Sequence, residues 1–145
     1  MDSAFLKQKL GFEETLISID IDKAGKISFS MPEHLKNKKG IYVFVLGEKF
    51  PRLKGETDIL YIGSTTRTYG ERLSQYINPD VEGRQRTNRR INNGLRRLLQ
   101  NGKLVFLLFK PMEDNPRIKE LENQLIEMFE KEHWELPPYN HQSGG

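Results

Sequence analysis

The sequence predicts an α+β domain in which helices flank a small antiparallel sheet of three strands. Two short apolar runs, Gly40–Gly47 and Ile59–Ser64, have the length and composition of strands. A third such run, Leu104–Phe109, comes after two segments with helical periodicity, and one more amphipathic segment follows it. The predicted order is therefore β-β-α-α-β-α, after a short β-rich N-terminal extension.

The extension comprises residues 1–39 and contains a predicted β-hairpin. Its two arms are Leu16–Asp22 and Lys26–Met31, which flank the turn sequence Lys23-Ala24-Gly25. The main domain is expected over residues 40–140, and residues 141–145 are expected to form a flexible tail.

The first two strands of the domain should form an antiparallel pair. Gly40–Gly47 is apolar on both of its alternating faces, which is typical of a strand covered on both sides. Residues Glu48–Asp58 carry proline, glycine and charged side chains, and so predict a long connecting loop. Strands joined directly by a loop, without a crossover helix, favour antiparallel pairing.

Two helices follow the strand pair. Thr68 and Glu71 have the spacing of a capping box, so a helix should begin there and run to about Ile77. A second helix is predicted near Asn88–Gln100, with Gly102 in the left-handed conformation that ends helices.

The last helix places one carboxylate among its core residues. Asn115 as the cap and Pro116 at the first helical position predict its start, and it should end near His133. At 100° per residue Glu122 falls within the apolar stripe. The apolar members of that stripe are Ile118, Leu121, Leu125, Met128 and Phe129. A buried carboxylate is costly unless a cation or hydrogen-bond donors meet it, which raises the question of its partner, and a structural ion pair is the simplest answer for Glu122.

The first of the three helices also carries a charged side chain near the core. Arg72 and Tyr76 lie one turn apart on it. The planar guanidinium of an arginine suits phosphate recognition. The alternative is an ion pair, and Glu122 is a possible partner for Arg72 in that case.

The composition fits one globular domain. The chain has 145 residues, of which 36% are hydrophobic and 30% are charged. No window is apolar enough to cross a bilayer and the N-terminus does not resemble a secretion signal, so a cytoplasmic protein without a membrane partner is expected. There is no cysteine, which excludes thiolate zinc sites and leaves oxygen ligands, suited to Mg²⁺ or Mn²⁺.

Positive charge is concentrated on one helix, although the formal net charge is only +3. The stretch from Gly83 to Leu104 contains six arginines and one lysine but no acid. The six arginines are Arg84, Arg86, Arg89, Arg90, Arg96 and Arg97. Such a surface is either a phosphate-binding face for DNA or RNA or an ordinary solvated face.

Five sequence elements together resemble the GIY-YIG nuclease family. Gly40-Ile41-Tyr42 and Tyr61-Ile62-Gly63 are similar to its two signature tripeptides. Arg72 in ERLSQY and Glu122 in LENQLIE match its helical arginine and its metal-binding glutamate, and Pro138-Tyr139-Asn140 resembles its terminal P-x-N. The two longer motifs, with Tyr76, are most similar to the nuclease module of bacterial excision repair.

The resemblance implies an endonuclease that hydrolyses DNA with one metal ion, leaving 5′-phosphate and 3′-hydroxyl ends. Glu122 would bind Mg²⁺ or Mn²⁺, and Arg72 would offset charge on the scissile phosphate. Tyr42, helped by Tyr61 and Tyr76, would orient or deprotonate the attacking water. Asn140 completes the implied catalytic set.

Two departures from the family pattern bear on substrate binding. The loop between the two tripeptides is longer than in most relatives, and Ser64 stands where a lysine often follows the second tripeptide. Arg67 is close enough in sequence to supply the missing contact. Two alternatives stay open: a nucleic-acid-binding module that does not cut, and a subunit that cuts only within a larger complex. Cutting both strands could require a homodimer or a partner protein.

Overall fold

The computed structural model describes residues 1–15, 19–79 and 86–141. It confirms the predicted α+β fold and the order β-β-α-α-β-α. The six elements are β4 (Gly40–Pro51), β5 (Glu56–Thr65), α3 (Tyr69–Ile77), α4 (Arg86–Gln100), β6 (Val105–Pro111) and α5 (Asn115–His133). No helix among the described residues is long and apolar enough to span a membrane.

The central sheet has four antiparallel strands in the described residues, in the order β1-β6-β4-β5. The additional strand is β1 (Glu13–Glu14), which pairs with the outer side of β6. Two exposed glutamates carry no apolar pattern, so the sequence offered no signal for this strand. Strand β5 forms the opposite edge of the sheet, a position that matters for the candidate site.

The hairpin β4–β5 is longer than predicted. The expected loop over Glu48–Asp58 is reduced to a short turn, because β4 continues to Pro51 and β5 begins at Glu56. The residue after the turn, Thr57, pairs with Phe50 across the hairpin. Polar side chains on an exposed hairpin extension look like a loop in sequence, yet the backbone pairing holds them in strands.

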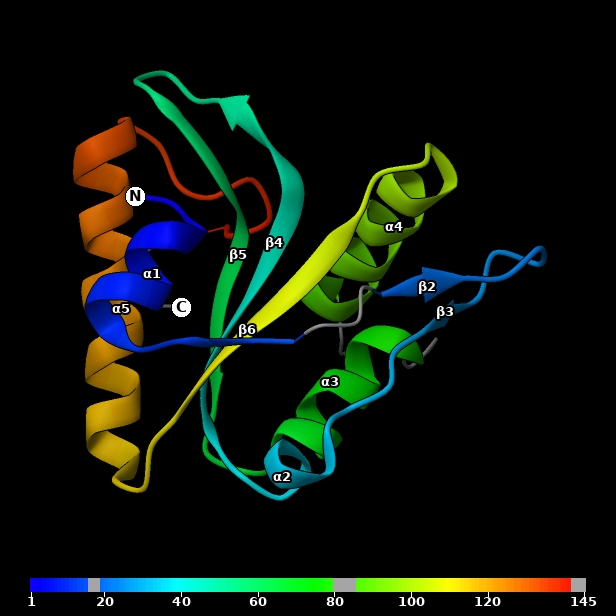
Figure 1. The fold of residues 1–145 in the computed structure, drawn as a ribbon, viewed down its shortest axis with the longest axis horizontal. Coiled ribbons are helices and arrows are strands. Elements are labelled where there is room, and N and C mark those ends of the chain that lie inside the picture. Colours follow the sequence, from blue (N-terminus) through cyan, green and yellow to red (C-terminus); the bar gives the residue numbers. More distant parts are fainter. Residues whose placement is uncertain (16–18, 80–85, 142–145) are drawn as a thin grey trace.

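Each face of the sheet is covered by its own set of helices (Figure 1). Helices α1 (Ser3–Leu10) and α5 cover one face, and α3 and α4 cover the other. The sheet has a hydrophobic core on each face, and alternate residues of β4 belong to one or the other. Tyr42 and Phe44 face α3 and α4, whereas Val43 faces α5. This agrees with the prediction that the strand is buried on both sides.

The N-terminal extension is less β-rich than predicted. It begins with α1, which is capped by the Asp2 carboxylate and ended by Gly11 at φ 70°. The hairpin consists of β2 (Asp20–Ile21) and β3 (Ile27–Ser28), so both arms are shorter than expected. Residues 16–18, in the first predicted arm, lie outside the described residues.

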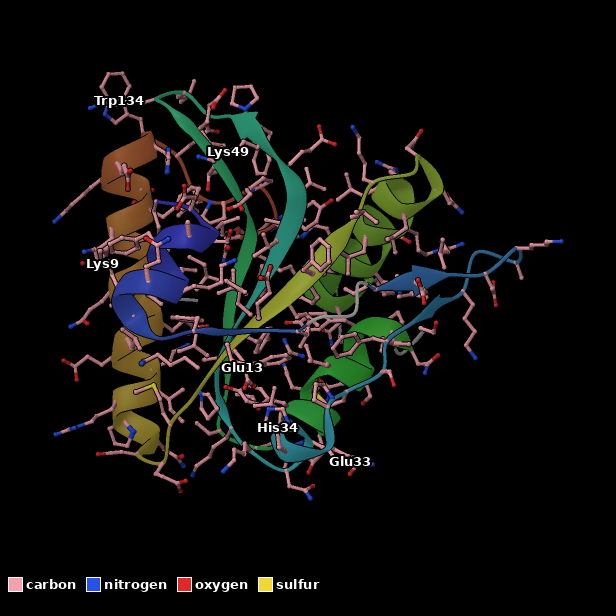
Figure 2. The ribbon with its side chains drawn as sticks, viewed as in Figure 1. Lys9, Glu13, Glu33, His34, Lys49 and Trp134 are labelled. Atoms are coloured by element: carbon pink, nitrogen blue, oxygen red, sulfur yellow. The ribbon has the colours of Figure 1, made fainter. Side chains whose placement is uncertain are left out.

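A short helix, α2 (Glu33–Lys36), completes the extension. His34 contacts Glu13 at 2.7 Å and so ties α2 to the edge strand β1 (Figure 2). The described part of the extension therefore contains helices α1 and α2 and strands β1, β2 and β3, and it lies against the domain as part of one packed structure.

Helix boundaries and one core assignment differ from prediction. Thr68 caps α3 as expected by accepting from the amide of Glu71 (3.2 Å), but the N-cap of α5 is Asp114, and Asn115 is already helical. Met128 was predicted to face the core, and this is wrong because its exposure is 43%. Helix α5 turns its Glu122 and Ile126 side towards the sheet, which leaves Met128 at the solvent margin.

Candidate active site

Three tyrosine hydroxyls meet on the α3 and α4 side of the sheet. Tyr42 comes from β4, Tyr61 from β5 and Tyr76 from α3. The hydroxyls of Tyr42 and Tyr76 are 2.6 Å apart, and the Tyr76 hydroxyl lies 3.5 Å from that of Tyr61. The structure thus brings together side chains that are separated by up to 34 residues in sequence.

Glycine at the end of the second tripeptide makes room for this cluster. Gly63 pairs with Tyr42 across the β4–β5 ladder. A Cβ on Gly63 would stand 2.7 Å from the Tyr42 ring and hydroxyl, and equally close to the Tyr61 ring. Any side chain at this position would displace both tyrosines, which is the steric reason for glycine here.

Arg72 lies against the tyrosine cluster. Its guanidinium carbon is 4.5 Å from the centroid of the Tyr76 ring, a cation–π geometry. Its Nη1 donates to Gln75 Oε1 at 2.6 Å and to Asn88 Oδ1 at 3.0 Å. Burial disfavours the charge, but the three tyrosines outweigh it and raise the pKa of Arg72. The cation is thus held in place by neutral acceptors, so its charge is not cancelled.

The sequence did not identify either of those two acceptors. Gln75 is on α3, one turn from Arg72, and Asn88 is a buried residue of α4. Asn92, one turn after Asn88, is also buried and donates to the backbone carbonyl of Tyr76 at 2.7 Å. The only available signal was that asparagines occupy the apolar side of a helix otherwise rich in arginine.

Burial raises the pKa of Tyr42 and the pKa of Tyr76, because removal from water disfavours the phenolate. Arg72 acts in the opposite direction on both groups but does not outweigh burial. Both hydroxyls are therefore protonated at neutral pH. This favours a role for Tyr42 in orienting water rather than in removing a proton unaided.

These raised pKa values predict a fall in stability in alkali. A group whose pKa is higher in the folded protein stabilises the fold below its unfolded pKa, about 10 for tyrosine, and loses that contribution as the pH rises further. The free energy of unfolding should hold between pH 7 and 9 and then decline above about pH 10. Urea titrations of the wild type and Tyr42→Phe would test this, since a decline of the same size in both proteins would rule Tyr42 out as a cause.

Arg67 opens onto the same region as Arg72. Both side chains line one surface hollow at the end of β5, together with Ser64, Thr65, Thr66, Glu71 and Gln75. Ser64 is the residue that stands in place of lysine, and the exposed Arg67 provides a positive charge within the hollow that Ser64 lines.

The side chain of Asn140 is hydrogen-bonded to the backbone of the second tripeptide. Its side-chain amide accepts from the Ile62 amide and donates to the Ile62 carbonyl, both at 3.0 Å. The amide of the preceding residue, Tyr139, donates to the Leu60 carbonyl at 2.9 Å. The C-terminal segment therefore covers the outer edge of β5 at Leu60 and Ile62, so Asn140 positions the strand that carries Tyr61.

Glu122 lies on the other side of the sheet from the tyrosines. It is on α5, is only 4% exposed, and has Ile118 and Leu125 of the same helix in the core beside it. Its carboxylate accepts from Lys119 Nζ at 2.8 Å, one turn away on α5. It forms no ion pair with Arg72, so that explanation for the two buried charges does not apply. Among the described residues, no group of three or more His, Cys, Asp or Glu side chains could hold a metal ion.

The arginines of α4 have different surroundings. Arg86 and Arg97 are exposed, whereas Arg89, Arg90 and Arg96 are partly buried. Arg84 lies outside the described residues. Within the described part of the chain, no acid pairs with Arg86, Arg90, Arg96 or Arg97. A helix with this much unneutralised positive charge is expected where an external anion binds.

Two solved nuclease structures are similar to this chain. Among solved structures, a mutant of EndoII from bacteriophage T4 gives a TM-score of 0.69 at 16% identity, covering 95% of this chain and 98% of that one. Restriction endonuclease HPY188I in complex with product DNA gives 0.47 at 21% identity, covering 98% of this chain and 87% of that one. Comparison with curated proteins gives no match.

The likeness to EndoII concerns the fold. The GIY-YIG catalytic domain matches residues 36–135, more than half of the chain, and that span includes both tripeptides, Arg72 and Glu122. With the tripeptides paired on β4 and β5 and the helical arginine stacked on Tyr76, whose hydroxyl contacts that of Tyr42, the chain belongs to the GIY-YIG family and is an endonuclease.

Proposed function

We propose that this endonuclease cuts DNA by divalent-metal-dependent hydrolysis with one metal ion, leaving 5′-phosphate and 3′-hydroxyl ends. The dependence on a divalent ion is what membership of this family implies. The observation that carries the proposal is the stacking of Arg72, held by neutral acceptors, on the ring of Tyr76, whose hydroxyl contacts those of Tyr42 and Tyr61. This arrangement places a cation and hydroxyl groups close together, where they can stabilise the charge that develops on a phosphate during phosphoryl transfer.

The protein groups have separate tasks in this proposal. Arg72 binds the scissile phosphate and offsets the charge that develops on its oxygens. Tyr42 orients the attacking water through its hydroxyl, and its contact with Tyr76 fixes the direction of that hydroxyl. Water attacks the phosphorus and the bond to the 3′ oxygen breaks, which leaves the phosphate on the 5′ end.

Glu122 is the residue that would hold the metal ion. It is an oxygen donor buried beside apolar side chains, and its one ion-pair partner within the described part of the chain is Lys119, which is itself 53% exposed. A carboxylate so placed suits a hard divalent ion whose other ligands come from outside the protein. The chemistry supplied by the bound ion is Lewis-acid stabilisation of charge on the phosphate.

The position of β5 supports a shared site for Glu122 and the tyrosines. Tyr61 and Ile62 are neighbours on β5, and they face the tyrosine cluster and α5 respectively. Because β5 is the outermost strand, a substrate at this edge can be approached from both faces of the sheet. Asn140, bound to Ile62, keeps this edge in a fixed conformation.

The arginine face of α4 supports DNA as the substrate. Counterion release by arginines on phosphates gives sequence-independent affinity that falls with salt. Neutralising the two exposed arginines, Arg86→Gln with Arg97→Gln, should weaken binding to unrelated DNA sequences alike. The slope of log affinity against log salt should become shallower by about 2. The measurement is fluorescence anisotropy over a range of salt concentrations, in chelator so that no cutting occurs.

A matched control removes two positive charges from the opposite face. Lys9 on α1 points outward (Figure 2), and Lys131 is exposed on α5. Lys9→Gln with Lys131→Gln should leave the slope close to that of the wild type. Equal slopes in the two double variants would assign the arginines of α4 to an ordinary solvated face.

The proposed activity is tested by incubating the protein with plasmid, single-stranded and branched DNA. Each substrate is given Mg²⁺, Mn²⁺ or a chelator, and the product ends are labelled to identify 5′-phosphates. Metal-dependent cutting of at least one substrate is expected. Tight binding without any cutting would instead favour a nuclease-like binding module or a subunit that needs a partner.

A further inference from the structure

Arg90 has surroundings that differ from those of the other arginines of α4. It lies one turn before Gly94 on the same side of the helix. The Tyr139 ring packs against Gly94 so closely that a Cβ there would stand 2.7 Å from it. Tyr139 in turn is bound through its amide to the Leu60 carbonyl at the edge of β5. Arg90 therefore lies beside the C-terminal segment that fixes the active-site strand.

The Arg90 guanidinium has a buried donor without an acceptor. Its Nη2 is inaccessible to water and has no hydrogen-bond partner among the described residues, and no described acid pairs with the side chain. Burial lowers the pKa of Arg90, and only the nearby tyrosines Tyr61, Tyr76 and Tyr139 oppose this. Those tyrosines are neutral, so the positive charge has no counter-charge from the described part of the chain. A partly buried positive charge without a counter-charge is costly, and an external anion bound at the accessible atoms of the Arg90 side chain would offset that cost.

Comparison with other arginines shows that this state is unusual. Arg52 also has an unpaired Nε, but its Nη2 binds Glu135 and the Leu136 carbonyl, both at 2.7 Å. Arg72 is satisfied through Nη1 by two neutral acceptors. Arg96 has an unpaired Nε as well, but its guanidinium lies next to Gly25 in the β2–β3 turn. Arg90 combines an unpaired donor with a place beside the tyrosine cluster.

We propose that Arg90 binds a backbone phosphate of the DNA next to the scissile phosphate, on the Leu60 side of the tyrosine cluster. Arg67 and Arg72 line the hollow at the Ser64 to Thr66 end of β5, whereas Arg90 lies near Tyr139, whose amide donates to the Leu60 carbonyl. Four strand residues separate Leu60 from Ser64, about 13 Å at the usual rise of a strand. Arg67 and Arg72 on one side of the tyrosine cluster, and Arg90 on the other, thus hold successive parts of one DNA strand. Arg90 sets the register of that DNA strand over the tyrosines. This inference rests on the proposed function.

The test uses short DNA duplexes with a mapped cleavage position and one neutral methylphosphonate, moved through successive phosphate positions. Binding is measured in chelator for the wild type, Arg90→Gln and Arg97→Gln. In the wild type, a methylphosphonate at one flanking position should weaken binding about tenfold, as expected when a charge-assisted contact is lost. In Arg90→Gln the same modification should have no further effect, whereas Arg97→Gln should keep the full sensitivity at that position.

The possible outcomes separate the two proposals. If Arg90→Gln keeps every sensitivity of the wild type, or loses sensitivity only at the scissile phosphate, the assignment of Arg90 is overturned and DNA cleavage stands. A wild type that binds and cuts no DNA overturns the proposed function, and the assignment of Arg90 falls with it. Should Arg90→Gln fail to fold, Arg90→Lys answers the same question, because lysine keeps the charge but not the planar fork, and sensitivity at that position should still decrease.

Discussion

Glu122→Gln should abolish DNA cleavage and leave DNA binding nearly intact. The substitution keeps the size of the side chain but removes the charge that a divalent ion needs. The fold should not suffer, because the one cation that pairs with the carboxylate in residues 1–15, 19–79 and 86–141 is Lys119, which is half exposed and one helical turn away. Ion pairs of this kind contribute about 0.5 kcal/mol or less, and a neutral amide is cheaper to bury. Unfolding in urea should therefore show unchanged or raised stability without metal.

The matched control is Glu127→Gln, which makes the same change at an exposed position of α5. It should cut DNA at the rate of the wild type. One result would contradict the assignment of Glu122 as the metal ligand. A Glu122→Gln protein that is destabilised by about 3–5 kcal/mol but still cuts DNA would show that the carboxylate is half of a buried structural pair, and the metal assignment would be wrong.

Tyr42→Phe should lower the rate of cleavage by a factor on the order of a hundred or more, while the protein remains folded. The lost hydroxyl is 2.6 Å from that of Tyr76 and is not accessible from bulk solvent. Removing one such hydrogen bond costs about 1 kcal/mol, equivalent to a few degrees in melting temperature for a domain of this size. Single-turnover cleavage at saturating DNA, together with thermal unfolding, separates the two effects.

Tyr69→Phe provides the control for this experiment. Tyr69 is a fully buried tyrosine on the same side of the sheet, and its hydroxyl donates to the Ile41 carbonyl at 2.9 Å. Its loss should cost similar stability without a comparable fall in rate. If Tyr42→Phe and Tyr69→Phe lose stability and activity in the same proportion, Tyr42 contributes a core hydrogen bond and not a catalytic hydroxyl.

Much of the fold was predictable because its strongest signals are local. The apolar run from Gly40 marks a strand buried on both faces, and the Thr68 cap marks the start of a helix within one residue. The cluster itself could be anticipated only through the resemblance, since periodicity does not reveal that Tyr42 and Tyr76 meet. The helical pattern placed Glu122 in the core, and the structure agrees.

Other features depend on contacts between distant segments and leave no local trace. The two glutamates of β1 become a strand only because β6 offers an unpaired edge. The acceptors that hold Arg72 come from two helices, and the partner of Asn140 is the backbone of β5. Arg90 and Arg97 are both arginines of α4, yet Arg90 has a buried donor and Arg97 is exposed. Such differences arise from tertiary packing, which composition and spacing do not encode.

The most direct test of the account measures cleavage of supercoiled plasmid in Mg²⁺ and in excess chelator, using the wild type, Glu122→Gln and Arg72→Gln purified in the same way. The account predicts nicked or linear plasmid with 5′-phosphate ends only for the wild type and only with Mg²⁺. Cleavage by the wild type that persists in chelator, or equal cleavage by all three proteins in Mg²⁺, would contradict it.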